Sequence, residues 1–184
     1  ANFFVYIVRY AVLDWGPTLL GEWKGVSIHH AGWMVAAFEI SGIVGMLVAG
    51  WATDRFFGGR GPRVCVICMA LATVFVALFW GISQPPMWLA TLLLGAAGFC
   101  IYGPQALVGI AAANIATKKA AATAVGFTGL FGYASTLVSG WGLGLLAQHY
   151  GWNIAVGALI LIAIMGTLIF MAAWSAKANG YDND

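Results

Sequence analysis

Six apolar stretches, each long enough to cross a lipid bilayer, dominate this sequence and leave few folds open to it. They cover roughly residues 1–21, 31–53, 63–83, 87–112, 119–147 and 152–175. A bilayer core of about 30 Å needs about 20 mostly apolar residues per helix. Hydrophobic residues make up 62% of the chain and charged residues only 8%, which is more apolar surface than a water-soluble domain of this size can bury. We therefore expect an all-α membrane protein with six transmembrane helices in residues 1–175 and a polar tail at 176–184.

The distribution of Lys and Arg between these stretches predicts how the bundle is oriented. One side of the predicted bundle carries Arg55, Arg60, Arg63, Lys118, Lys119 and Lys177. On the other side only Lys24 is found. Because loops rich in Lys and Arg stay in the cytoplasm, the segments after the second and fourth helices and the tail at 176–184 are predicted to be cytoplasmic.

No catalytic or metal-binding arrangement is evident in the sequence. Cys65 and Cys68 form a CxxC pair, but they lie in an apolar stretch without a second ligand pair, so we interpret them as packing residues. The net charge of +2 is too small to indicate nucleic-acid binding. The glycines of 119–147 follow no strand and precede no Lys-Ser/Thr pair, unlike those of a phosphate loop. We expect no metal, no cofactor, no nucleic-acid partner and no enzymatic activity.

Arg9 is the residue whose position most needs an explanation. It lies 11 residues before Leu20, which at 1.5 Å per residue is about 16 Å and close to the bilayer midplane. Exposing it to lipid there would cost about 3 kcal/mol, so we expect it to face a watery cavity. Asp14 is five residues away and about 140° around the helix, so no ion pair within the helix is expected. Glu39, in the second stretch, is a possible partner across the bundle.

Two interpretations of Arg9 are open: binding of an anionic ligand, and a purely structural ion pair. We favour the first, because a planar guanidinium fork matches the oxygens of a carboxylate or phosphate. Tyr6 lies three residues earlier and shares the face of Arg9. Tyr102 precedes Gly103-Pro104, and a helix broken by proline at membrane depth usually lines a cavity, although packing is an equal alternative. Tyr133 lies near the middle of the fifth stretch.

Other polar residues carry weaker signals. Asp14 is a candidate for a gate or a proton site. Gln105 and Asn114 are as easily hydrogen-bond partners between helices as substrate contacts.

Several stretches resemble known transporters. "GWATDRFFGGRGPR" (50–63) resembles the short cytoplasmic loop between the second and third helices of a six-helix half in the major facilitator superfamily. "ANFFVYIVRYAVLDWGPTLL", "IYGPQALVGIAAANIATKKAAATAVGFTGLFGY" and "SGWGLG" resemble the C-terminal half of the organophosphate:phosphate antiporters, above all their glycerol-3-phosphate branch. This resemblance covers nearly the whole chain apart from its polar tail.

The resemblance implies a secondary transporter of the bacterial inner membrane that exchanges an organophosphate, glycerol 3-phosphate first, for inorganic phosphate by alternating access. An N-terminal six-helix half would complete the cavity and supply a second arginine. By the same resemblance, the substrate-binding residues are Arg9, Tyr6, Tyr102 and Tyr133. The residues implied in salt-bridge rearrangement or gating are Asp14, Glu39, Asp54 and Arg55.

Alternative functions remain open on the sequence. "GPQALVGIAAA" and "SGWGLG" are similar to the hexose-phosphate transporter and its sensor relative, so a hexose-phosphate transporter or a sugar-phosphate sensor is the first alternative. A proton-coupled solute transporter, with Asp14 or Glu39 as the proton site, is the second.

Overall fold

The structure, a computed structural model, describes residues 1–83, 85–116 and 119–175, and these contain helices but no strand. The helices are α1 (Asn2–Lys24), α2 (Ile28–Phe57), α3 (Gly61–Gly81), α4 (Met87–Ile115), α5 (Ala121–Leu137), a π-helical turn (Val138–Gly142), α6 (Leu143–Tyr150) and α7 (Trp152–Ala172). The run from α5 through α6 forms one span, so six helices in the described residues are long and apolar enough to cross a membrane. The predicted all-α fold with six spans is confirmed, whereas the predicted tail at 176–184 lies outside the described residues.

The helix ends differ from the apolar boundaries by a few residues, because capping rather than hydropathy sets them. The second helix starts before residue 31, since the Ser27 side chain accepts a hydrogen bond from the His30 backbone N–H and caps it. It continues past residue 53 to Phe57 and stops where Gly58 takes a left-handed conformation, with φ of 56°. The last helix ends at Ala172, earlier than the expected 175.

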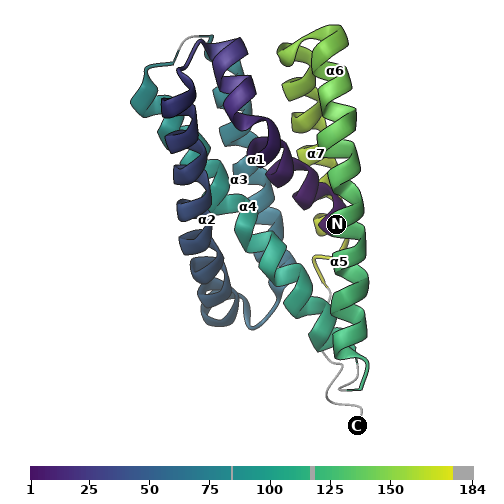
Figure 1. Ribbon diagram of the computed structural model, residues 1–184. Coiled ribbons are helices and arrows are strands. Elements are labelled where there is room, and N and C mark those ends of the chain that lie inside the picture. The colour runs from purple at the N-terminus through teal and green to yellow at the C-terminus, as the bar shows by residue number, and fades with distance from the viewer. Residues whose placement is uncertain (84, 117–118, 176–184) are drawn as a thin grey trace.

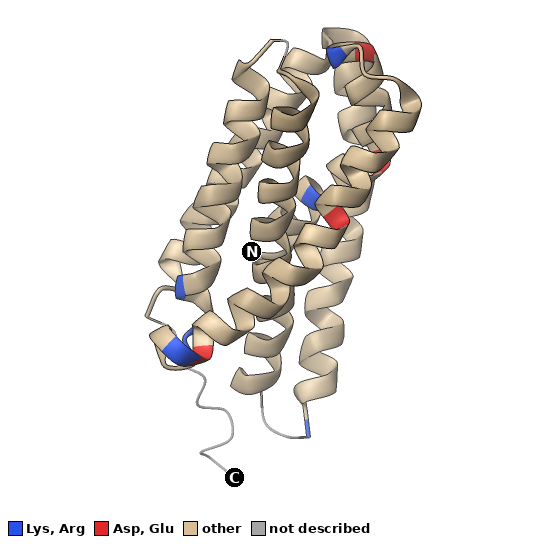
Figure 2. Cartoon of the chain, turned by 90° about the vertical axis from the view of Figure 1, so that its left-hand side faces the viewer, with Lys and Arg blue, Asp and Glu red and all other residues tan. Residues whose placement is uncertain are grey.

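The helices form a bundle in which α2 and α4 lie side by side, while α5 and α6 run along the opposite flank (Figure 1). The C-terminal ends of α2 and α4 and the N-terminal ends of α3 and α5 lie at the same end of this bundle. Lys and Arg residues gather at that end (Figure 2). Lys118 and Lys177, which we also expect there, lie outside the described residues. The described part of the chain thus has the asymmetric charge distribution from which its orientation is predicted.

Glycines bring the backbones of α2 and α4 into direct contact. A Cβ atom added at Gly45 would lie 1.9 Å from the Phe99 carbonyl oxygen, and one at Gly98 would lie 2.2 Å from the Phe38 carbonyl oxygen. Small residues allow membrane helices to approach this closely. The Ser41 hydroxyl donates a 2.6 Å hydrogen bond across the same contact to the Gly95 carbonyl oxygen. The close contact fixes α2 relative to α4, and both helices contribute side chains to the site described below.

This contact predicts that Gly45→Ala destabilises the protein by about 1–3 kcal/mol, because the added methyl group would overlap a backbone carbonyl that cannot move freely. Gly50→Ala, on the same helix, is the matched control, since nothing lies within 4 Å of its added Cβ. The measurement is the apparent melting temperature in detergent micelles. If the Gly45 variant melts no lower than the Gly50 variant, the close α2–α4 contact is wrong.

Candidate functional site

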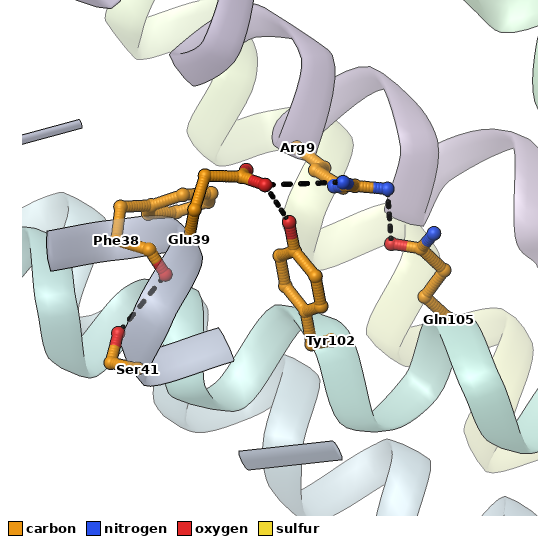
Figure 3. Close-up of polar contacts among 6 residues, drawn as sticks. All are labelled: Arg9, Phe38, Glu39, Ser41, Tyr102 and Gln105. Atoms are coloured by element: carbon orange, nitrogen blue, oxygen red, sulfur yellow. Dashed lines mark hydrogen bonds and ion pairs between the residues drawn. The ribbon is translucent and has the colours of Figure 1, made fainter. Parts of the chain in front are cut away.

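Arg9 lies at the centre of a polar network that joins three helices (Figure 3). Its Nη2 is 3.3 Å from Glu39 Oε2 on α2, and its Nη1 donates a 3.2 Å hydrogen bond to Gln105 Oε1 on α4. The Arg9 and Glu39 side chains are 17% and 30% exposed. Glu39 is therefore the partner across the bundle that the sequence left open, and it contacts the guanidinium through a single oxygen rather than as a bidentate pair.

Tyr102 contacts both members of this ion pair. Its ring lies 4.4 Å from Arg9 Cζ, within the range of a cation–π interaction. The Tyr102 hydroxyl donates a hydrogen bond to the same Glu39 oxygen that faces Arg9. Only 7% of Tyr102 is exposed, so one face of the guanidinium is covered by a buried aromatic ring.

The network has unused hydrogen-bonding capacity. Arg9 Nε and Glu39 Oε1 are buried and make no hydrogen bond. A guanidinium carries more N–H donors than the two contacts to Glu39 and Gln105 use. Because buried polar atoms are almost always paired, Arg9 Nε and Glu39 Oε1 each have hydrogen-bonding capacity that no described residue uses.

A group of tyrosines extends the site toward α5. The Tyr6 ring packs edge-on against Tyr133, with 6.0 Å between centroids, and lies 5.7 Å from the Tyr10 ring. The Tyr10 ring in turn lies 5.5 Å from Arg9 Cζ. The Tyr10 ring therefore lies near both the Tyr6 ring and the Arg9 guanidinium and connects them. The sequence analysis gave Tyr10 no role. The four-residue spacing of Tyr6 and Tyr10, which places two rings on one helix face, was the available signal.

The remaining predicted residues are not part of this network. Asp14 is exposed on α1, and the ion pair between Arg9 and Glu39 is the only one among the described side chains. Among the described side chains, Asp14 therefore makes no ion pair with Arg9. Asp54 and Arg55 are exposed near the end of α2. They lie 15 and 16 residues after Glu39 and therefore more than about 22 Å from it along the helix.

Asp54 contributes to a separate surface cavity of about 450 Å³ at the charged end of the bundle. Asn114, considered above as a possible substrate contact, also lines this cavity and not the Arg9 network. Within the ranges that the structure covers, no cluster of His, Cys, Asp or Glu has the arrangement of a metal site. The Arg9 network offers a positive charge, hydrogen-bonding groups and an aromatic surface, and these can bind an anionic ligand.

Comparison with known proteins supports a transporter family. The model of the Major Facilitator Superfamily matches residues 1–180. The chain is 40% identical over 177 residues to a probable hexose phosphate transport protein of Chlamydia pneumoniae, covering 96% of this chain and 39% of the relative. It is 36% identical over 198 residues to a glycerol-3-phosphate transporter of Haemophilus influenzae, covering 97% and 41%. It is 34% identical over 175 residues to the membrane sensor protein UhpC of Salmonella typhimurium, covering 95% and 39%.

These comparisons confirm the resemblance seen in the sequence, and a further relative is named hexose-6-phosphate:phosphate antiporter. The chain spans about two fifths of the length of the relatives that it matches. The six apolar helices and the bacterial transporter relatives together indicate a multi-pass membrane protein. With a family match that covers nearly its whole length, the chain belongs to the Major Facilitator Superfamily.

Proposed function

We propose that this chain is the C-terminal half of a bacterial inner-membrane transporter that exchanges an organophosphate for inorganic phosphate by alternating access. The observation that carries the proposal is the half-buried Arg9 guanidinium, which α1 places between partners on α2 and α4 and which still has an unpaired N–H donor. Relatives named as glycerol-3-phosphate and hexose phosphate transporters support a phosphorylated substrate. The half-transporter assignment rests on the resemblance and on the fraction of each relative that the chain covers.

In this proposal the phosphoryl group replaces Glu39 as the counter-ion of Arg9. The single 3.3 Å contact is weaker than a bidentate carboxylate or phosphate contact, so a phosphoryl group that engages two N–H donors competes well for the guanidinium. Tyr102 already donates to Glu39 and can keep that carboxylate hydrogen-bonded after it leaves Arg9. The tyrosines Tyr6, Tyr10 and Tyr133 then offer hydroxyl groups to the rest of the substrate.

A second six-helix half would close the cavity. Large apolar side chains on α5 and on the π-helical turn after it are exposed in this chain, among them Phe127, Leu130, Phe131 and Leu137 on α5 and Trp141 in the turn. Such a surface needs cover from lipid or from another helical domain. Transporters of this kind bind substrate near the bilayer midplane between two halves that rock against each other. By resemblance, the other half supplies a second arginine that shares the phosphoryl group with Arg9, and Asp54 and Arg55 act in a cytoplasmic gate.

The organic part of the substrate is proposed as glycerol 3-phosphate, with a hexose phosphate as the alternative. Relatives of both kinds match nearly the whole chain. Competition between the two compounds for uptake of radiolabelled phosphate distinguishes these substrates. A sugar-phosphate sensor is the second candidate function, because a membrane sensor protein is among the relatives. Accumulation of labelled organophosphate in cells supports the transporter, whereas binding without accumulation supports the sensor.

The proposed function predicts that Arg9→Lys lowers phosphate–organophosphate exchange by more than about tenfold in the complete transporter. Lysine keeps the positive charge but loses the planar fork, and a hydrogen bond to a charged group is worth about 1.5–3 kcal/mol. The measurement is exchange of labelled phosphate in proteoliposomes. Lys119→Arg, a swap between the same residue types at an exposed loop position, serves as the control.

Near-normal exchange by the Arg9 variant would contradict a bidentate phosphate site. Transport that follows a pH gradient and ignores phosphate would instead support a proton-coupled transporter, with Asp14 or Glu39 as the proton site.

The proposed orientation places Lys119 in the cytoplasm and His149 on the opposite side of the membrane. Both residues are exposed. Lys119 lies just before the span Ala121–Tyr150, and His149 lies at the opposite end of that span. We expect Lys119→Cys to react with a membrane-impermeant maleimide only in inside-out vesicles, and His149→Cys only in right-side-out vesicles. The unsubstituted protein is the control, because it shows how much maleimide reacts with the native cysteines alone. The reverse pattern would show that the positive end of the bundle is outside.

A further inference from the structure

Gln105 is a neutral residue in direct contact with the central guanidinium. It lies on α4 directly after Pro104 and three residues after Tyr102, so the two side chains share one face of the helix. Its Oε1 accepts a hydrogen bond from Arg9 Nη1 at 3.2 Å, while Glu39 contacts Nη2. Arg9 thus has one charged and one uncharged partner, each on a different nitrogen (Figure 3).

The contact with Arg9 also determines which way the Gln105 amide is turned. A guanidinium has only donors, so only the amide oxygen can face it, and the two N–H groups must point elsewhere. Figure 3 shows the amide nitrogen on the side away from Tyr102. Among the described residues it donates to no partner, and Gln105 is only half-buried. Gln105 therefore presents an unused amide donor close to the Arg9 guanidinium, which itself keeps an unpaired N–H group.

We propose that Gln105 is a positioning residue for the phosphoryl group: it holds the plane of the Arg9 guanidinium and donates its amide N–H to the same anion. This inference rests on the proposed function and adds a residue that the resemblance does not assign. Glu39 cannot hold the guanidinium in the loaded state, because its negative charge is repelled by the arriving phosphate. Gln105 carries no charge, so it can stay in place while Glu39 leaves. The guanidinium then keeps its orientation through the exchange of one anion for another.

The test is the concentration dependence of phosphate:phosphate exchange by the complete transporter in proteoliposomes, with inorganic phosphate as the probe. We expect Gln105→Leu to raise KM for phosphate at least tenfold and to leave the maximal rate within about twofold of that of the unsubstituted protein. A tenfold change corresponds to about 1.4 kcal/mol, in the range expected for losing a hydrogen bond to a charged group. Gln148→Leu makes the same chemical change at an exposed position of α6 and is the matched control.

Gln105→Glu keeps the size and shape of the side chain and so tests the role without loss of packing. It places a second carboxylate on Arg9, and we expect it to raise KM for phosphate more than Gln105→Leu does. Adding Glu39→Gln removes one of the two carboxylates, so the network again has a single negative charge. The double variant should recover at least part of the lost affinity for phosphate. A purely structural role for Gln105 predicts no such recovery, because the second substitution removes only charge.

The inference is overturned if Gln105→Leu leaves KM within twofold, if it lowers only the maximal rate, or if Glu39→Gln gives no recovery in the Gln105→Glu background. Those outcomes, in a protein whose exchange is lost with Arg9→Lys, leave the proposed function intact and remove only the role of Gln105. A protein that exchanges no phosphate, or exchanges it normally with Arg9→Lys, contradicts the proposed function itself.

Discussion

The free-energy cost of placing a permanently charged guanidinium deep in a bilayer governs the centre of this structure. An arginine in lipid is unfavourable by several kcal/mol, so Arg9 must find its partners within the protein or in an aqueous cavity. The bundle provides a carboxylate from α2 and both an amide and an aromatic face from α4. None of these partners engages the guanidinium as a bidentate acceptor, and its Nε is left without a hydrogen bond. The guanidinium therefore keeps hydrogen-bonding capacity that the anion of the proposed function would use.

The close packing of α2 and α4 is what makes this arrangement possible. Gly45 and Gly98 let the two backbones touch, and this distance brings Glu39 within reach of the Tyr102 hydroxyl. The charged network thus depends on the glycines, since a wider separation of α2 and α4 would leave Glu39 without its hydrogen bond from Tyr102. The glycine-rich α2–α4 contact acts on the site indirectly, through helix position.

Sequence reasoning singled out Arg9, Glu39 and Tyr102, because charge and aromatic hydroxyl groups stand out in apolar stretches, and the structure brings these three residues into contact. It placed Tyr6 on the face of Arg9 but overlooked Tyr10, which connects the two in space. It rated Gln105 as a weak candidate, because an amide within a helix gives no sequence signal that separates a ligand contact from ordinary packing. The helix ends were also displaced by a few residues, since hydropathy responds to lipid whereas Ser27 and Gly58 set the caps.

The sequence by itself determined the number of spans, the unequal distribution of positive charge between the two ends, and the position of Arg9 near the middle of the first span. These properties are local: they depend on runs of apolar residues and on the constant rise of a helix. Only the tertiary structure decided that Glu39 pairs with Arg9, and that Gln105 contacts the other terminal nitrogen of the guanidinium. Contacts between residues 30 and 96 positions apart depend on how helices pack against one another, and no spacing along the chain encodes that packing.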